Sequence, residues 1–196
     1  MNSYFSDKDK KLIWKEGPSK SLLKTCVFEV TSRHNTSSTG ISGDYIIMNA
    51  RDWVIVIAKK GEKLLMVKQY RHGEGKLSVE FPGGVIDSGE SPEDAAKREL
   101  EEETGCIAKK LTRLGCLNPN PALFSNHVFI FLAEDLVETG VQHLDRDEMI
   151  NVIELTENQV IDGMGTAEFP HALMATAMML YVKHQRKYVE SRHAYA

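Results

Sequence analysis

"GVIDSGESPEDAAKRELEEETGC", residues 84–106, contains a helix whose two ends are both marked by the residues around it. A serine such as Ser91 is suited to cap a helix N-terminus, and proline is favoured at the next position, here Pro92. Gly105 supplies the left-handed residue at which helices commonly stop. The segment therefore predicts a glycine-rich loop followed by a helix from about Ser91 to Thr104.

Four glutamates lie within five consecutive positions of this helix, Glu99, Glu101, Glu102 and Glu103, with only Arg98 beside them. Like charges three or four positions apart destabilise a helix by roughly 0.2–0.5 kcal/mol per pair. Glu99, Glu102 and Glu103 have that spacing, which brings their carboxylates to one face. A solvated acidic face is one interpretation. Convergent carboxylates are also the ligands that Mg2+ or Mn2+ prefers, often together with substrate phosphates, and this predicts a metal site.

The composition excludes several other classes of protein. The net charge of the 196 residues is -4, which gives no electrostatic reason to expect a nucleic-acid partner. No apolar run approaches the roughly 18 residues that span a membrane, and the N-terminus lacks the apolar core of a signal peptide. The three cysteines are scattered and form no CxxC pair. We therefore expect a cytoplasmic protein with reduced thiols and no membrane contact.

The rest of the chain alternates apolar and polar segments. Before the helix, the pattern predicts a polar segment over 1–20, a strand over 22–32 and a polar loop over 33–43. Three β-rich runs follow within 44–71. After the helix, it predicts three strands and then two helices: 111–120, 126–136, 149–155, 156–164 and 169–188. This order predicts a mixed sheet with helices packed on it.

The segment that begins at Gly84 resembles the Nudix box, GX5EX7REUXEEXGU, in which U is a bulky aliphatic residue. The matching residues are Gly84, Glu90, Arg98, Glu99, Leu100, Glu102, Glu103 and Gly105, and only Cys106, at the final U, departs from the pattern. The resemblance implies a Nudix hydrolase, with an α/β fold that is an α/β/α sandwich around a mixed β-sheet. It also implies an N-terminal β element over residues 1–50, which forms a homodimer in this branch of the family, and a Nudix domain over 51–196.

The resemblance also implies roles for individual residues. Glu99, Glu102 and Glu103 would bind Mg2+ or Mn2+, together with the backbone carbonyl of Gly83, and Glu102 and Glu103 would be catalytic. Metals held in this way neutralise the charge that develops on a diphosphate and activate the attacking water. Glu90 and Arg98 would join the loop to the helix through a salt bridge. The structural positions of the motif are Gly84, Glu90, Arg98 and Gly105.

The segment "LLMVKQYRHGEGKLSVEFPGG", residues 64–84, resembles the branch that hydrolyses ADP-ribose and other nucleoside diphosphate sugars. In that branch an arginine after the strand contacts the substrate phosphates, which implies this role for Arg71. Glu80 matches a glutamate that contributes to nucleotide or metal contacts, although a polar residue at the edge of the core fits the position almost as well. The "QYR" and "VEFPGG" matches argue against dinucleoside polyphosphates or coenzyme A as substrates.

A carboxylate must accept the proton of the attacking water. In this branch the catalytic base comes from an acidic loop after the box, which implies Glu148, with Asp147 and Asp145 as alternatives. The expected reaction cleaves the pyrophosphate bond of a nucleoside diphosphate sugar to a nucleoside monophosphate and a sugar phosphate. A binding module without catalysis is the alternative from another class. Such a module should have lost box residues, whereas every predicted metal ligand is present.

Overall fold

The computed structural model describes residues 4–146 and 148–193, which form two compact units. The first unit consists of the chain up to Arg51 together with Asn118–Asn126, and the second of Asp52–Leu117 and the chain from His127 onward. The division at Arg51 lies next to the boundary expected at residue 50. The segment Asn118–Asn126 also belongs to the first unit, and the predicted division into domains at residue 50 stays a prediction.

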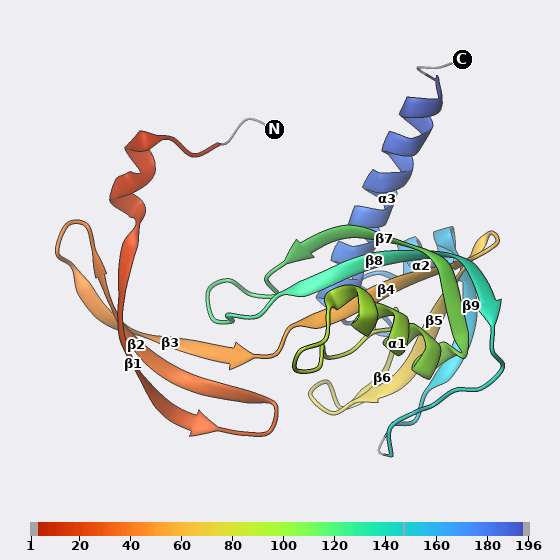
Figure 1. Cartoon of the computed structure of the whole chain (residues 1–196), viewed down its shortest axis with the longest axis horizontal. Helices are drawn as coiled ribbons and strands as arrows, with labels where there is room; N and C mark the ends of the chain where they lie inside the picture. Colours follow the sequence, from red (N-terminus) through yellow and green to blue (C-terminus); the bar gives the residue numbers. More distant parts are fainter. Residues whose placement is uncertain (1–3, 147, 194–196) are drawn as a thin grey trace. The chain divides into compact units, whose positions relative to one another are not determined.

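The first unit contains an antiparallel sheet of three strands in the order β1-β2-β3 (Figure 1). A 3-10 helix precedes the sheet, and the elements are Asp7–Leu12, β1 (Trp14–Lys24), β2 (Phe28–Ser37) and β3 (Ser42–Ala50). Asn118–Asn126 joins this unit through the backbone hydrogen bond from Met48 to the Leu123 carbonyl, at 2.8 Å. The N-terminal region is therefore a β element, as the resemblance implies.

Two sequence predictions in this unit were wrong, whereas the β-rich run expected from residue 44 lies in β3. The strand expected over 22–32 is interrupted by a turn, in which the Thr25 hydroxyl accepts hydrogen bonds from the backbone of Val27 and Phe28. The polar segment 33–43, expected to be a loop, supplies the end of β2 and the start of β3. Every residue of β1 is exposed, so this strand has no buried face to impose the alternation of apolar and polar residues on which prediction depends.

The second unit contains a mixed sheet of six strands. Their order is β6-β5-β4-β8-β7, with β9 paired to β5, and only β4 and β8 are parallel. The strands are β4 (Trp53–Lys60), β5 (Lys63–Arg71), β6 (Lys76–Glu80), β7 (Cys106–Leu117), β8 (Val128–Glu138) and β9 (Asn151–Thr156). The hairpin predicted at "KKGE" joins β4 to β5, and the predicted mixed sheet is confirmed.

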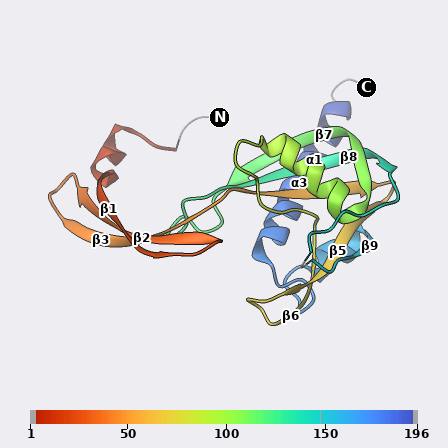
Figure 2. The ribbon, with the colours of Figure 1, turned by 60° about the horizontal axis from the view of Figure 1, so that its bottom comes forward.

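Helices cover both faces of this sheet (Figures 1 and 2). They are α1 (Pro92–Thr104), α2 (Glu157–Gly163) and α3 (Ala172–His193). Alternate residues of β4 face opposite ways: Val54 and Val56 pack in a cluster with Leu100 of α1, whereas Ile55 and Ile57 pack with residues of α3. This α/β/α arrangement has two cores. None of the helices in the described ranges is long and apolar enough to cross a membrane.

The α1-side core matters most for function because it holds the predicted metal helix against the sheet. Ala95, Ala96 and Leu100 are fully buried there, on the face of α1 that contacts β4, β5 and β7. Helix α3 covers the other face, where its Met174 and Met178 are both 3% exposed. The glutamates of α1 are therefore carried on a helix whose opposite side is anchored.

Candidate active site

The ends of α1 show the capping that the sequence predicts. The Ser91 hydroxyl accepts a hydrogen bond from the backbone N–H of Asp94, and Pro92 begins the helix. Gly105 follows the last turn in a left-handed conformation, with a φ of 65°, and its N–H donates to the Glu101 carbonyl at 2.8 Å. Helix capping of this kind fixes where the helix begins and ends, and therefore which of its glutamates share a face.

The loop before the box passes very close to strand β4. The backbone N–H of Val54 donates to the Gly84 carbonyl at 2.8 Å. Gly83 has a φ of 154°, and a Cβ at this position would lie 2.2 Å from the Val54 carbonyl oxygen. Its N–H donates to Oε2 of Glu103 at 2.8 Å. Glycine at 83 thus allows a contact between loop, strand and metal helix that a side chain would block.

Arg98 connects the loop to the acidic face of α1. Its Nε and Nη2 donate to the two carboxylate oxygens of Glu90, both at 2.9 Å, which is the expected salt bridge. Its Nη1 also donates to Glu99 at 2.8 Å and to Glu102 at 2.9 Å. These hydrogen bonds, above all those to Glu90, raise the pKa of Arg98. The sequence predicted the pair with Glu90 but not that the same guanidinium also holds two of the predicted metal ligands.

Burial disfavours the ionised forms of two glutamates on α1, Glu99 and Glu103. The Glu103 side chain is almost fully buried, and burial, the largest cause, raises its pKa to about 8 against the hydrogen bond from Gly83. Burial likewise raises the pKa of Glu99 to about 6, although Arg98 opposes the shift. The charges of Glu99 and Glu148 raise the pKa of Glu103 further. Two buried carboxylates with raised pKa values constitute a site that a cation would stabilise.

These residues fit a divalent cation in their chemistry, although the described part of the chain contains no group of three His, Cys, Asp or Glu side chains already closed around a metal position. Arg98 donates hydrogen bonds to one oxygen of Glu99 and one of Glu102, and the N–H of Gly83 donates to one oxygen of Glu103. The Glu99 carboxylate lies over Gly84, where a Cβ would come within 2.5 Å of it. All the side-chain donors are carboxylate oxygens, which hard cations prefer. The assignment of the ligands remains a prediction.

The metal-free protein should lose stability as the pH rises. The ordinary carboxyl pKa is 4.5, and the pKa values of Glu99 and Glu103 are raised in the folded state. At pH values between these limits the two side chains are ionised in the unfolded state but keep more of their protons in the folded state. Stability therefore falls as the pH increases from about 4.5 to about 8. Melting temperatures measured with a chelator from about pH 5 to pH 8 should decline more in the wild type than in Glu103→Gln.

Mg2+ or Mn2+ should reverse this loss, because a bound cation compensates the buried charges and binds only the folded state. The gain in melting temperature is expected to be largest near the upper end of the pH range, where more of the carboxyl groups are ionised. A melting temperature that stays constant across a metal titration at about pH 8 would contradict the metal assignment.

The loop that follows β8 is attached to the C-terminal end of α1. The backbone N–H of Thr139 donates to the Gly105 carbonyl at 2.7 Å, and that of His143 donates to the Glu102 carbonyl at 2.9 Å. The side-chain amide of Gln142 donates to the Glu103 carbonyl. These contacts use carbonyl groups at the end of the helix that have no partner within it. Neither Gln142 nor His143 was identified from the sequence, because no motif links them to the box.

Glu148, the predicted base, lies at the far end of this loop and is exposed. Its backbone N–H donates to the Asp145 carbonyl at 3.0 Å, and its carboxylate accepts from the Asp145 N–H at 3.2 Å. Its charge raises the pKa values of Glu99 and Glu103 and that of Arg71. Glu148 therefore belongs to the same electrostatic neighbourhood as the glutamates of α1. Asp147, an alternative base, lies outside the described residues.

Arg71 and Glu80 form a pair on strands β5 and β6. Arg71 donates from Nε at 2.9 Å and from Nη2 at 2.6 Å to the two oxygens of Glu80. Burial would raise the pKa of Glu80, but the hydrogen bonds and charge of Arg71 outweigh it and the pKa is lowered. His171 is also near, since its charge helps to lower the Glu80 pKa. Glu80 is fully buried, as a polar residue at the core edge would be.

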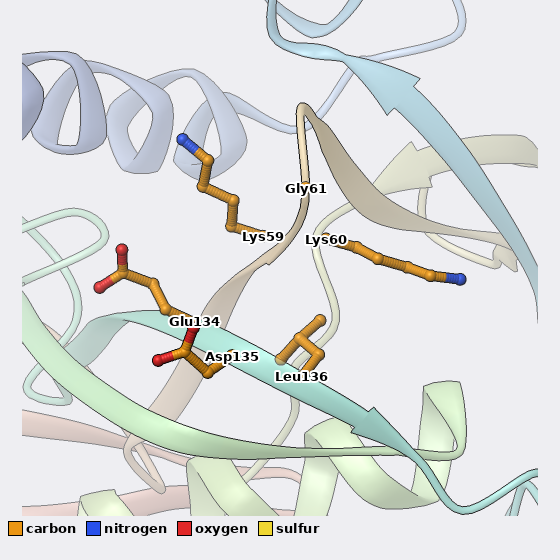
Figure 3. Close-up of a pocket in the computed structure, with 6 residues that line it drawn as sticks. All are labelled: Lys59, Lys60, Gly61, Glu134, Asp135 and Leu136. Carbon is orange, nitrogen blue, oxygen red and sulfur yellow. The ribbon is translucent and has the colours of Figure 1, made fainter.

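A recess of about 320 Å³ lies at the opposite end of β4, between the β4–β5 turn and β8 (Figure 3). It is lined by Lys59, Lys60, Gly61, Glu134, Asp135 and Leu136. Figure 3 shows the Lys59 and Lys60 side chains pointing away from each other. Lys59 pairs with Glu157, and Lys60 with both Glu138 and Glu154. None of the predicted site residues lines this recess.

Comparison with known proteins agrees with this geometry. The family model described as the NUDIX domain matches residues 48–172. An ADP-ribose pyrophosphatase of Bacillus subtilis is 39% identical over 126 residues, which are 64% of this chain and 68% of the relative. The ADP compounds hydrolase NudE of Escherichia coli is 28% identical over 162 residues, which are 82% of this chain and 87% of the relative.

A crystal structure of an ADP compounds hydrolase has the same fold. It superimposes with a TM-score of 0.78 at 26% sequence identity, covering 91% of this chain and 95% of that protein. The family model spans more than half of this chain and includes the entire acidic helix. The chain therefore belongs to the Nudix hydrolase family, whose box supplies its loop, its capped helix and its cluster of glutamates.

Proposed function

We propose that the protein hydrolyses the pyrophosphate bond of ADP-ribose or a related nucleoside diphosphate sugar, releasing a nucleoside monophosphate and a sugar phosphate. One observation carries the proposal. Gly83, Glu99, Glu148 and Arg71, which come from four separate segments, all act on the ionisation of Glu103. These effects support a site in which the proposed metal carboxylates, a cation for phosphate and a candidate base surround one buried side chain. The names of the two relatives and of the similar structure support an ADP-containing substrate.

Each group has a proposed part in the reaction. Glu99, Glu102, Glu103 and the Gly83 carbonyl would hold Mg2+ or Mn2+, which when bound neutralises charge on the diphosphate and lowers the pKa of water. The partly exposed Arg71 guanidinium binds the diphosphate oxygens. As the water oxygen forms its bond to phosphorus, the bridging P–O bond breaks. The water proton passes to the carboxylate of Glu148.

A panel of substrates tests the proposal. The panel contains ADP-ribose, other ADP-sugars, other nucleoside diphosphate sugars, a dinucleoside polyphosphate and coenzyme A, each with Mg2+ and separately with Mn2+. We expect cleavage of an ADP-sugar, detected as AMP together with a sugar phosphate. The folded wild-type protein must cleave at least one nucleoside diphosphate sugar for the proposal to stand. Preferential cleavage of coenzyme A or of the dinucleoside polyphosphate would keep the chemistry and replace the substrate.

Glu148→Gln should lower kcat by roughly a hundredfold, a typical contribution of a general base. The melting temperature and its increase with Mg2+ should change less than in Glu103→Gln, since Glu148 is exposed and acts on Glu99 and Glu103 only through its charge. The pH dependence of kcat identifies the role, because the acidic limb of the profile should disappear with the base. Asp145→Asn is the matched control in the same loop. If only Asp145→Asn flattens the profile, the base is Asp145.

We also propose that the protein is a cytoplasmic homodimer joined through its first unit. Large apolar side chains are exposed there, including Leu22, Leu23 and Ile46, each about half accessible. Large apolar side chains exposed on one small unit make it a candidate interaction surface. All the cysteines are free, which is usual in a reducing compartment. A mass measured by light scattering tests the dimer, and a monomer at micromolar concentration would contradict it.

A further inference from the structure

Glu80 is an unusual residue for a substrate contact because it is inaccessible. Its side chain is 0% exposed, whereas that of its partner Arg71 is 43% exposed. Both carboxylate oxygens of Glu80 are occupied by Arg71. A carboxylate without accessible surface cannot contact a nucleotide unless the groups around it move, and moving Arg71 away would leave a buried charge without a partner.

The register of the hairpin shows that the two side chains must extend along the strands to meet. Arg71 lies opposite Lys76, whereas Glu80 lies opposite Val67, which is four residues further back along β5. At about 3.3 Å per residue this is roughly 13 Å of strand. Arg71 and Glu80 share a face of the sheet, so the arginine extends back along the strand to reach the carboxylate. The interaction therefore directs the guanidinium away from the strand end and back along β5, where the charges of Glu103 and Glu148 act on it and raise its pKa.

The pairing also leaves the appropriate edge of the guanidinium for a substrate. An arginine has two donor edges, Nε with one terminal nitrogen and the two terminal nitrogens together. Glu80 occupies the first edge, through Nε and Nη2. The second edge contains Nη1, which donates no hydrogen bond to any group in the described part of the chain. This edge matches two phosphate oxygens bidentately, and the charge of Arg71 already lowers the pKa of Glu103.

We propose that Glu80 is a positioning residue that holds Arg71 so that its Nη1–Nη2 edge faces the diphosphate. The proposal rests on the proposed function, since it requires a substrate with adjacent phosphates. Glu80 does not contact the substrate. Its effect is to remove the rotational freedom of a long side chain before binding, so that less is lost when the complex forms. This proposal differs from both interpretations from sequence, in which Glu80 contributes to nucleotide or metal contacts or is a polar residue at the edge of the core.

A double-mutant cycle tests the proposal with Glu80→Gln, Arg71→Gln and the double variant. The measured quantities are kcat and KM for ADP-ribose with Mg2+, and the Kd for ADP-ribose in a chelator by calorimetry. Glu80→Gln should raise KM and Kd by roughly tenfold, or about 1.4 kcal/mol, with a smaller change in kcat. In the Arg71→Gln background the same substitution should have no further effect, because it acts through the arginine.

The controls separate this role from general damage. Glu74→Gln removes an exposed ion pair with Lys76 on the same hairpin and should leave KM unchanged. Arg71→Gln leaves Glu80 buried without a partner, so its folding is checked by melting temperature. Arg71→Lys replaces it in the cycle if it does not fold. Lysine keeps the charge but lacks the planar fork, and it should not restore the wild-type KM.

Three results would overturn the proposal. An unchanged KM and Kd in folded Glu80→Gln would show that the carboxylate does not position Arg71. Additive losses in the double variant would show that Glu80 acts independently of the arginine. A wild-type protein that neither binds nor cleaves any nucleoside diphosphate sugar would instead remove the proposed function, and this role with it.

Discussion

Replacing Glu103 with glutamine should lower kcat by roughly three orders of magnitude, since metal stabilisation of the transition state is worth several kcal/mol and about 1.4 kcal/mol corresponds to tenfold. Glutamine has nearly the same shape and can still accept the hydrogen bond from Gly83, which is 2.8 Å from the Glu103 carboxylate. The negative charge, however, is removed from the proposed metal site. The expected loss is therefore in kcat and in metal affinity and not in the fold.

The metal-free Glu103→Gln protein should at the same time be at least as stable as the wild type near neutral pH. Burial raises the pKa of Glu103 to about 8, which means that ionising this side chain opposes folding. A neutral amide avoids that opposition. Activity and stability should thus change in opposite directions, which is the pattern expected of a functional site that carries electrostatic strain.

Glu101→Gln is the matched control, because Glu101 occupies the variable position of the box in the same turn of α1. It removes the same charge from the same helix but from a different face, and kcat should stay within about twofold of the wild type. Steady-state kinetics at saturating Mg2+ and melting curves in a chelator check both variants. A near-normal kcat in Glu103→Gln would remove Glu103 from the metal site.

Gly83→Ala should destabilise the protein by roughly 3 kcal/mol or more, the range reached by backbone strain and steric overlap. The backbone φ of 154° is one that L side chains rarely adopt, and the new Cβ would lie 2.2 Å from the Val54 carbonyl oxygen. For a domain of this size the melting temperature should fall by roughly 6–12 °C. The protein that remains folded should be inactive, because the N–H of residue 83 and its carbonyl would both be displaced.

Two other glycines make this prediction specific. Gly73→Ala adds a Cβ that meets nothing within 4 Å, so stability and activity should stay near the wild type. Gly84→Ala places a Cβ 2.5 Å from the Glu99 carboxylate, which is the end of a flexible side chain and can move. This variant should keep most of its stability and lose metal affinity. Equal melting temperatures for Gly83→Ala and Gly73→Ala would contradict the close approach to β4.

The first unit shows where sequence patterns were insufficient. Residues 33–43 are polar and were expected to form a loop, yet they supply parts of two strands. Residues 16–20, at the end of the polar segment expected before the first strand, lie within β1, where the register with β2 shifts between Glu16 and Ser19. Such a shift accommodates Pro18, which has no N–H to donate. Strands without a buried face carry no periodic signal, and only the pairing with a neighbouring strand reveals them.

The acidic helix was the opposite case. Its caps at Ser91 and Gly105 are local interactions, and the shared face of Glu99, Glu102 and Glu103 follows from helical geometry alone. The same spacing carried the resemblance to the Nudix box. Local hydrogen bonding and the period of the helix are encoded within a few residues, so the helix, its carboxylate face and the family could all be inferred from the order of the amino acids.

The long-range electrostatics could not be inferred in this way. The neighbours of Glu103 include Gly83, Arg71 and Glu148, and its raised pKa arises mainly from burial. The sequence motif identified these residues separately, but it did not indicate that Arg98 would bind two further glutamates or that Arg71 would pair with Glu80. Burial and contacts between distant segments exist only after the chain has packed. Composition and spacing therefore determined the chemistry available to this protein, whereas the packing of loop, helix and hairpin decided which charges face one another.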